Sequence, residues 1–386
     1  MINLFQPNLD INDALLRYQQ TLESGWLGRG SVTAQFEQVL AEFLGTGPDS
    51  VHCVSSCTSA IFEICSALAL GSGDTVVIPT NSFPSVASAI MASGARLEVI
   101  DIEIASGNIS IEKLEEFCTK EVPKAIFVTD YGGIPVSVSR LKKIVGPDCF
   151  ILVDAAASLG TRYKNSDEFI HSEADFVCYS FDAMKLITCG EGGAAVIKDK
   201  QLMEKFREFS YLGLPSKQKS GLDVAKDGGQ AGWWEYDLNC FGRRSVMSDL
   251  SAGLGLSQMK SIESKLSIRR QLKTEYEDQL NDLSDIKFLG GNSENFEVSN
   301  YFCTILSDKR DDLAKFLLKN NIYTSFRYWP IHKMDIFKSG CSDRNYAVGN
   351  HMANNALNLP IHDALTLDQI REICDLIKVF FAKEAK

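Results

Sequence analysis

The chain has 386 residues, of which 45% are hydrophobic and 23% charged, and this ordinary composition excludes a disordered or collagen-like protein. Its 39 basic and 50 acidic residues give a formal net charge of −11, so we expect no nucleic-acid partner, since phosphate contacts need surplus lysine and arginine. No apolar run is long enough to span a bilayer, and we expect no membrane association.

The cysteines and the N-terminus bear on compartment and metal binding. The 11 cysteines include no C-x-x-C pair and the five histidines no H-x-x-x-H pair, so we expect no metal site. Several cysteines lie in apolar runs, where a reduced thiol behaves as a small hydrophobe. The first residues lack the basic start and apolar core of a signal peptide. We therefore expect a cytoplasmic protein.

Apolar runs and helical segments alternate over the first 200 residues. Two helices are expected within residues 1–46, with Asp10 near a helix start and residues 33–43 amphipathic. Runs rich in Val, Ile and Phe then predict seven strands, at residues 51–55, 75–79, 96–100, 124–129, 149–153, 175–180 and 193–197. Helical periodicity follows most of them, at residues 58–70, 83–92, 111–117 and 139–145. This alternation predicts an α/β fold with a mostly parallel seven-stranded sheet covered on both faces.

The pattern changes after residue 200. A Gly-, Lys- and Ser-rich stretch at 213–232 predicts a loop. Residues 248–283 predict one long helix or a bent pair. Strands at 301–306 and 322–326 and helices at 311–320 and 367–381 complete a smaller α+β unit. We expect a large domain at residues 1–250 and a small C-terminal domain at residues 251–386.

Ligands of open parallel sheets gather beyond the carboxyl ends of the strands, so the residues just after each strand are the candidates. The first strand is followed by Ser55, Ser56, Cys57 and Thr58 at a helix start. Free N–H groups and the helix dipole can bind phosphate there, and plain N-capping by Ser56 or Thr58 is the alternative.

Two ionisable residues follow other strands. Asp154 ends an apolar strand, where a carboxylate is costly unless a cation meets it, and a cap or salt bridge is the alternative. Lys185 follows the strand at 175–180 and precedes a Gly-rich turn. It is a candidate imine-forming amine, because the pKa of a lysine falls readily in a dry or cationic site, although most lysines are solvated surface groups.

Together these residues suit one cofactor. Pyridoxal phosphate needs a lysine for its aldehyde, a carboxylate for its ring nitrogen and a helix start for its phosphate. Asp154 would keep the pyridine nitrogen protonated, so that the ring accepts carbanion electrons. Phe83, after the strand at 75–79, could stack on the ring, although core packing is commoner for a phenylalanine.

The chain resembles the pyridoxal-phosphate sugar aminotransferases of the DegT/StrS family along nearly its whole length. The most specific likeness is Ser180-Phe181-x-x-x-Lys185 with Gly190-Glu191-Gly192-Gly193. The other motifs are Gly25-Trp26-Leu27-Gly28-Arg29-Gly30, Gly73-Asp74, Pro79-Thr80-Asn81-Ser82-Phe83, Asp101-Ile102-Glu103, Tyr131-Gly132-Gly133-Ile134-Pro135, Asp154-Ala155-Ala156, Met247-Ser248-Asp249-Leu250 and Leu359-Pro360-Ile361-His362.

The resemblance implies a fold-type I PLP-transferase that acts as a homodimer with cofactor sites at the subunit interface. It assigns Lys185 the Schiff base with pyridoxal 5'-phosphate and the later role of proton-transferring base, with pyridoxamine phosphate as the intermediate form. Ser180, Thr58 and the N–H of Cys57 would bind the phosphate, and Phe83 would lie against the ring. The implied substrates are glutamate as amino donor and a nucleotide-linked keto-deoxysugar as acceptor, aminated at C3 or C4.

Three positions depart from the family pattern. Cys57 replaces the usual glycine, and its side chain could crowd the phosphate. Ala157 replaces the Gln or His that contacts the phenolic oxygen of the cofactor. Arg244 stands where the family has an asparagine that reaches the phosphate from the partner subunit. We hypothesise that Arg244, with Arg243 a weaker candidate, takes over this contact as a charged donor, the alternative being a surface ion pair.

Other functions remain to be weighed. A dehydrating branch of the family carries histidine in place of the lysine, so Lys185 favours amino transfer over a deoxysugar dehydratase or other lyase. A non-catalytic cofactor-binding partner protein would be expected to lose Lys185 or Asp154. Trp329 and His332 are candidates for the substrate side, although an aromatic cluster is more often core.

Overall fold

The computed structural model describes residues 1–166, 168–216, 225–226, 232–290, 295–341 and 345–384. Most of the loop expected at 213–232 therefore lies outside the described residues. Within the described chain, no helix combines the length and the apolarity needed to cross a membrane.

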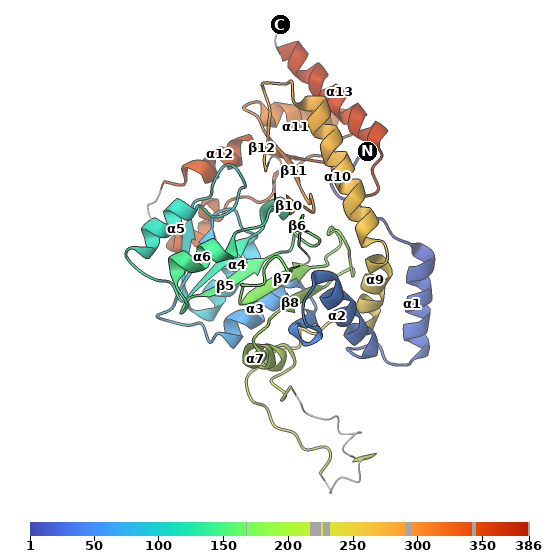
Figure 1. Ribbon diagram of the computed structural model, residues 1–386, viewed down its shortest axis with the longest axis vertical. Helices are drawn as coiled ribbons and strands as arrows, with labels where there is room; N and C mark the ends of the chain where they lie inside the picture. Colours follow the sequence, from blue (N-terminus) through green and yellow to red (C-terminus); the bar gives the residue numbers. More distant parts are fainter. Residues whose placement is uncertain (167, 217–224, 227–231, 291–294, 342–344, 385–386) are drawn as a thin grey trace.

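A seven-stranded sheet lies at the centre of the fold (Figure 1). Its order is β1–β8–β7–β5–β4–β2–β3, and only β8 runs antiparallel to its neighbours. The strands are β1 (Val51–Val54), β2 (Thr75–Pro79), β3 (Arg96–Ile100), β4 (Ala125–Thr129), β5 (Phe150–Asp154), β7 (Phe176–Ser180) and β8 (Gly193–Val196). Each strand overlaps its predicted range, and the mostly parallel sheet is confirmed. These strands read as continuous apolar runs because both faces of the sheet are covered.

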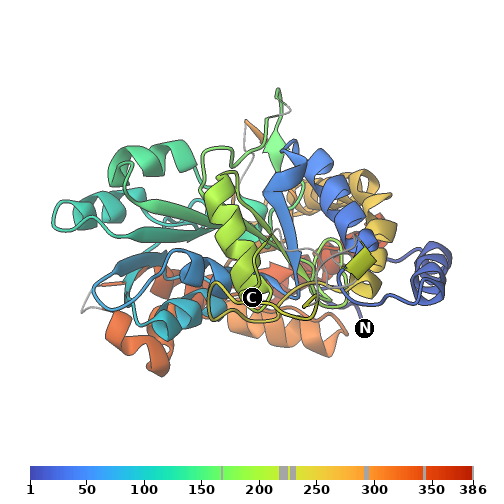
Figure 2. The ribbon, with the colours of Figure 1, turned by 90° about the horizontal axis from the view of Figure 1, so that it is seen from below.

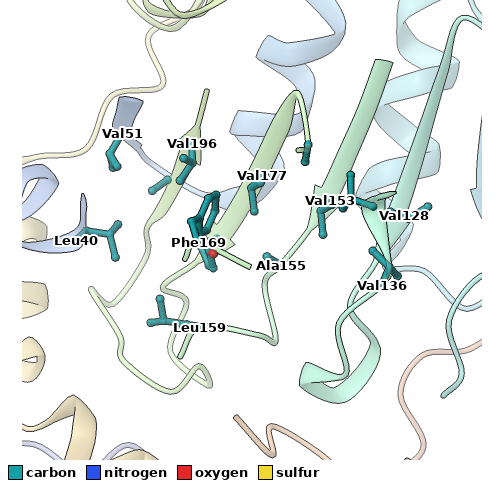
Figure 3. Packing of buried hydrophobic residues seen from close by; sticks show 14 of the residues in the cluster. Leu40, Val51, Val128, Val136, Val153, Ala155, Leu159, Phe169, Val177 and Val196 are labelled. Carbon is teal, nitrogen blue, oxygen red and sulfur yellow. The ribbon is translucent and has the colours of Figure 1, made fainter. Parts of the chain in front are cut away.

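Helices pack on both sides of the sheet (Figure 2). One apolar cluster joins it to α2 (Ser31–Leu44), α5 (Ile111–Cys118), α6 (Val138–Val145) and α9 (Asp249–Met259). A second cluster joins the opposite face to α3 (Cys57–Ala67), α4 (Pro84–Ser93) and α7 (Lys200–Ser210). Figure 3 shows Val51, Val196, Val177 and Val153, from four neighbouring strands, within the first cluster. Burial of these side chains supplies the main stabilising free energy of the large unit.

The C-terminal part has its own antiparallel sheet and its own apolar cluster. Strands β9 (Lys287–Phe288), β11 (Cys303–Leu306) and β12 (Ala356–Leu359) pack with α10 (Ile262–Leu280), α11 (Arg310–Lys319) and α13 (Leu367–Glu384) at one end of the molecule (Figure 1). The remaining elements are α1 (Ile11–Glu23), β6 (Arg162–Tyr163), β10 (Phe296–Glu297), α12 (Ala347–Asn355) and the short 3₁₀ segments η1 (Pro48–Ser50), η2 (Tyr131–Gly133), η3 (Ile331–Lys333) and η4 (Asp335–Gly340).

Local sequence patterns predicted some of these elements correctly and others wrongly. Asp10 caps α1 by accepting the N–H of Asp13 at 3.1 Å. The segment at 248–283 is the bent pair α9 and α10, interrupted at Lys260 and Ser261. The strand predicted at 322–326 is wrong, because only isolated bridges occur there. Ile322 of this segment is buried in the C-terminal apolar cluster, although the segment forms no continuous ladder of hydrogen bonds with a neighbouring strand.

The domain division after residue 250 stays a prediction, supported by the separate C-terminal cluster. The first eight residues also contact the C-terminal part of the chain. Ile2 forms a bridge with Ile322, and Nζ of Lys265 donates to the carbonyl of Asn8 at 2.6 Å. The chain therefore begins beside its C-terminal part, as Figure 1 shows.

Candidate active site

Asp154 lies at the carboxyl end of β5, where it pairs with Cys178 of the neighbouring strand β7. Its side chain is only 5% exposed and accepts the N–H of Ala156 at 3.1 Å. Burial raises the pKa of this carboxyl, and the Ala156 N–H and the charge of Lys185 act against that rise. An ionised Asp154 therefore needs a cation, and Lys185 is the cation that the fold brings to it.

Lys185 lies on the turn that follows β7, and its Nζ lies 4.6 Å from the centre of the Tyr301 ring. Burial disfavours the charged amine, yet Tyr301, Tyr328 and the carboxylates of Asp182 and Asp154 together raise its pKa above the usual value. The lowered pKa that we considered for this lysine is not found. Its charged neighbours are acidic rather than cationic, and they favour the protonated amine.

A single glycine brings the start of α3 to the end of β7. Gly193 pairs with Ser180 in the sheet, and a Cβ at Gly193 would lie 2.3 Å from the backbone nitrogen of Cys57. Any larger residue would push the two elements apart. Ser56 caps α3 by accepting the N–H of Ser59 at 3.0 Å. The first turn of the helix therefore packs directly beside Ser180.

Several hydrogen-bond donors at this junction have no acceptor within the described chain. The hydroxyls of Ser180 and Thr58, both half-buried, have no hydrogen-bond partner among the described residues. The N–H groups of Cys57 and Thr58 belong to the first helical turn, where the backbone offers no acceptor and the dipole is positive. Such a group of donors suits an anion of phosphate size.

The side chain of Cys57 does not add charge to this junction. A hydrogen bond with Cys178 and burial raise the pKa of the Cys57 thiol well above its usual value. The thiol therefore stays neutral at physiological pH and is engaged with β7. The crowding of a phosphate by this side chain, which we considered from the sequence, therefore concerns a neutral thiol that is directed toward Cys178.

Phe83 precedes α4 and is 44% exposed. Its ring meets the ring of Tyr328 edge-on, with 5.4 Å between ring centres. A phenylalanine that leaves this much surface in water is not serving as core. One part of its ring is free to cover a planar ligand.

Arg244 is exposed and does not contact Asp154 or Lys185 within the described chain. Its guanidinium lies 5.4 Å from the centre of the Tyr211 ring. Arg243 is directed elsewhere, with its guanidinium 3.7 Å from the buried carboxylate of Glu63. Of the two arginines, Arg244 is thus the one with no acidic partner among the described residues.

The structure also places residues at the site that sequence patterns did not single out. Tyr301 and Tyr328 come from the C-terminal part and face Lys185. Behind Asp154, His171 Nε2 lies 2.7 Å from Asp130 Oδ2, and both side chains are fully buried. No local signal marks these residues, because each is distant in sequence from the residue it meets.

Trp329 and His332 occupy different surroundings. Both ring nitrogens of His332 are engaged, Nδ1 with Thr80 Oγ1 at 2.5 Å and Nε2 with Asn350 Oδ1 at 3.1 Å. Its ring also stacks on Tyr346 at 4.3 Å. These contacts leave His332 no free nitrogen for a substrate. Trp329 is 51% exposed.

Position 157 carries no polar side chain. Ala157 is buried in an apolar cluster that contains Tyr131, Tyr301 and Phe302, with Tyr328 packed against it. Its carbonyl accepts the hydroxyl of Ser299 at 2.8 Å. As for metals, the described part of the chain contains no group of three or more His, Cys, Asp or Glu side chains suited to hold an ion.

Comparisons with known proteins agree with this geometry. The model of the DegT/DnrJ/EryC1/StrS aminotransferase family matches residues 9–378. The chain is 31% identical over 383 residues to the dTDP-4-dehydro-2,3,6-trideoxy-D-glucose 4-aminotransferase of Saccharopolyspora spinosa, a match that covers 97% of this chain and 95% of that protein. It is 25% identical to the GDP-perosamine synthase of Vibrio cholerae, covering 99% of both.

Solved structures that are similar to this chain are also aminotransferases. An aminotransferase from Streptoalloteichus hindustanus superposes with a TM-score of 0.89 at 30% identity, covering 100% of both chains. A putative sugar aminotransferase from Streptococcus pneumoniae, in its PMP-form, superposes with a TM-score of 0.88 at 25% identity, covering 99% of this chain and 100% of that one.

Proposed function

The chain belongs to the DegT/DnrJ/EryC1/StrS aminotransferase family, and on that basis we propose that it transfers an amino group from glutamate to a nucleotide-linked keto-deoxysugar, with pyridoxal phosphate as cofactor. The observation that carries the proposal is the meeting of a buried carboxylate and a half-buried amine, Asp154 and Lys185, beside the free donors at the start of α3. Transamination with this cofactor needs these three features together.

The residues present fit pyridoxal phosphate. The close approach at Gly193 leaves the hydroxyls of Ser180 and Thr58 and the N–H of Cys57 free for a phosphate. Asp154 is buried and lacks any cation besides Lys185 among the groups that influence its pKa. When bound, the protonated pyridine ring of the cofactor accepts the electron pair released as a substrate C–H bond breaks.

Each residue has a distinct role in this proposal. Asp154 holds a positive charge on the ring nitrogen, because a buried carboxylate favours a cationic partner. Lys185 would hold the cofactor covalently through its Nζ and would afterwards carry the proton between cofactor and substrate carbon at that atom. Ser180 and Thr58 bind the phosphate, and Phe83 covers one ring face, which fits its exposed surface.

We further propose that the enzyme is a homodimer in which Arg244 reaches the phosphate held by the partner subunit. Two features support this. Arg244 is exposed with no acidic partner in the described chain, and the segment before it exposes large apolar side chains, with Trp234 63% and Phe241 102% exposed. Helix α1 likewise exposes Ile11 and Leu15. Apolar groups of this size on a surface are typical of a protein interface.

Arg327 supports an acidic amino donor such as glutamate. Its side chain lies 3.8 Å from the sulfur of Met184, next to Lys185, and 5.2 Å from the centre of the Phe5 ring. No carboxylate pairs with this guanidinium among the described residues. An unpaired arginine at the mouth of the site is suited to bind a substrate carboxylate in two-point fashion.

The names of two relatives support a nucleotide-linked sugar as the acceptor. The Saccharopolyspora enzyme is named for a dTDP-linked 4-keto sugar and the Vibrio enzyme for a GDP-linked product. We propose an acceptor of this class, aminated at C3 or C4 for use in a surface polysaccharide or natural product, in the cytoplasm.

Mass spectrometry of products from a panel of keto nucleotide sugars with glutamate tests this function. The expected product is an amino sugar nucleotide, with glutamate converted to its keto acid. Lys185→Ala should lose both turnover and the visible absorbance of the imine, whereas Lys205→Ala, which changes an exposed lysine of α7, should change neither. Loss of water from the sugar without amination would contradict the proposal, as would full turnover by Lys185→Ala.

A further inference from the structure

The cofactor proposed above brings an oxygen that needs a hydrogen-bond donor. The phenolic oxygen of pyridoxal phosphate lies on the ring carbon next to the one that carries the aldehyde. If the aldehyde carbon were joined to Lys185, that oxygen would therefore lie on the side of the ring that carries the lysine. An anionic oxygen in a partly buried site is costly without a donor, and Ala157 offers only a methyl group.

Three tyrosines belong to or pack against the apolar cluster that contains Ala157, and the hydroxyls of two of them are already engaged. The hydroxyl of Tyr131 donates to the carbonyl of Arg327. The hydroxyl of Tyr301 donates to the carbonyl of Met184 at 3.5 Å, while its ring lies under Nζ of Lys185. Neither hydroxyl is free for a ligand without losing its present acceptor.

Tyr328 differs from both. Its ring packs edge-on against Phe83 at 5.4 Å and against Phe302 at 6.0 Å. Its hydroxyl has no hydrogen-bond partner within the described chain, and its only such bond is from its backbone N–H to Asn81 Oδ1. The ring of Tyr328 therefore lies between Phe83, which we propose covers the cofactor, and the apolar cluster that contains Ala157. Its hydroxyl forms no hydrogen bond within the described chain.

The charge state of Tyr328 suits a donor. Burial raises the pKa of its phenol well above the usual value, and the charge of Lys185 opposes this only in part. The charges of Asp154 and Tyr301 raise it further. The phenol thus keeps its proton throughout the neutral range. Its ring packs against the cluster that contains Tyr301, the residue whose ring lies under Nζ of Lys185.

We propose that the hydroxyl of Tyr328 donates a hydrogen bond to the phenolic oxygen of bound pyridoxal phosphate. It thereby supplies the donor that the methyl side chain of Ala157 lacks. The assignment rests on the proposed function, since it concerns the same cofactor. Its consequence is electronic, because a donor on this oxygen stabilises the deprotonated form of the bound cofactor.

Tyr328→Phe tests the assignment, because it removes the hydroxyl and keeps the ring that packs against Phe83. The readout is the pH midpoint of the visible absorbance of the bound cofactor, measured without substrate. Loss of one hydrogen bond to a charged oxygen should raise the midpoint by about one to two pH units. Tyr301→Phe is the matched control and should shift it much less.

A second variant keeps the test decisive. Adding Ala157→Gln to Tyr328→Phe supplies an amide donor at position 157 and should return the midpoint toward that of the wild type. If Tyr328→Phe retains cofactor poorly, rescue by the same glutamine supports the assignment and failure of rescue overturns it. An unchanged midpoint in Tyr328→Phe, or a larger shift in Tyr301→Phe, also overturns it. A wild-type protein without any visible cofactor absorbance would instead refute the proposed function.

Discussion

Replacing Asp249 by alanine should destabilise the chain strongly, because this one carboxylate holds the start of α2. Its oxygens accept the N–H groups of Gly30, Val32 and Thr33 at 2.8, 3.2 and 2.9 Å and the hydroxyl of Thr33 at 2.6 Å. The side chain is 2% exposed, and α9, which begins at Asp249, packs on α2. Asp249 thus caps a helix more than 200 residues away in sequence.

The magnitude follows from which donors can find water after the change. The N–H of Val32 is only half-buried and will be solvated, whereas both donors of Thr33 are buried and would be left without an acceptor. Each unsatisfied buried donor costs about 1–3 kcal/mol, and loss of a helix cap costs about 1 kcal/mol. We expect a total loss of about 3–7 kcal/mol for Asp249→Ala and a smaller loss for Asp249→Asn, which keeps one oxygen.

Urea unfolding of the cofactor-free protein, followed by circular dichroism, measures this loss. The matched control is Asp282→Ala, an exposed aspartate with no partner among the described residues, which should change the free energy of unfolding by less than about 0.5 kcal/mol. The reasoning is refuted if Asp249→Ala and Asp282→Ala unfold at the same urea concentration.

Three further predictions concern cofactor binding. Arg244→Ala should weaken cofactor retention roughly ten- to a hundredfold by equilibrium dialysis, with a smaller effect for Arg243→Ala, and unchanged affinity would remove the partner-subunit assignment. Ser180→Ala should weaken it by roughly ten- to a hundredfold, as loss of one hydrogen bond to a charged phosphate predicts, with the melting temperature unchanged. Burial raises the folded-state pKa of Asp154 above its unfolded value, so its ionised form costs stability as the pH rises through the folded pKa. Cofactor-free Asp154→Asn should therefore have a higher melting temperature than the wild type at neutral pH, and this difference should become smaller as the pH falls toward the ordinary pKa of an aspartate. Its affinity for the cofactor should be lower than that of the wild type. A difference in melting temperature that grows in acid would contradict this prediction.

The sheet and the order of its strands along the chain were predictable from local patterns. Each strand is a short apolar run with both faces buried, a property that neighbouring residues alone encode. Positions at the strand ends followed from the same runs, so Asp154 and Ser180 were expected at one edge of a parallel sheet. Strand β12 was not predicted, because it follows α12 directly without a turn residue between them, and the two-residue strands β6, β9 and β10 were not predicted either.

Only the tertiary structure decided what surrounds the reactive groups. Tyr301 and Tyr328 reach Lys185 from the other part of the chain, and they help to make the direction of its pKa shift the reverse of the one considered from sequence. The cap from Asp249 to α2 and the pairing of His171 with Asp130 likewise join residues far apart in sequence. Sequence determines which segments are apolar, because that property is local. Burial, charge and hydrogen-bond partners depend on which distant segments the fold brings together, and no local pattern records them.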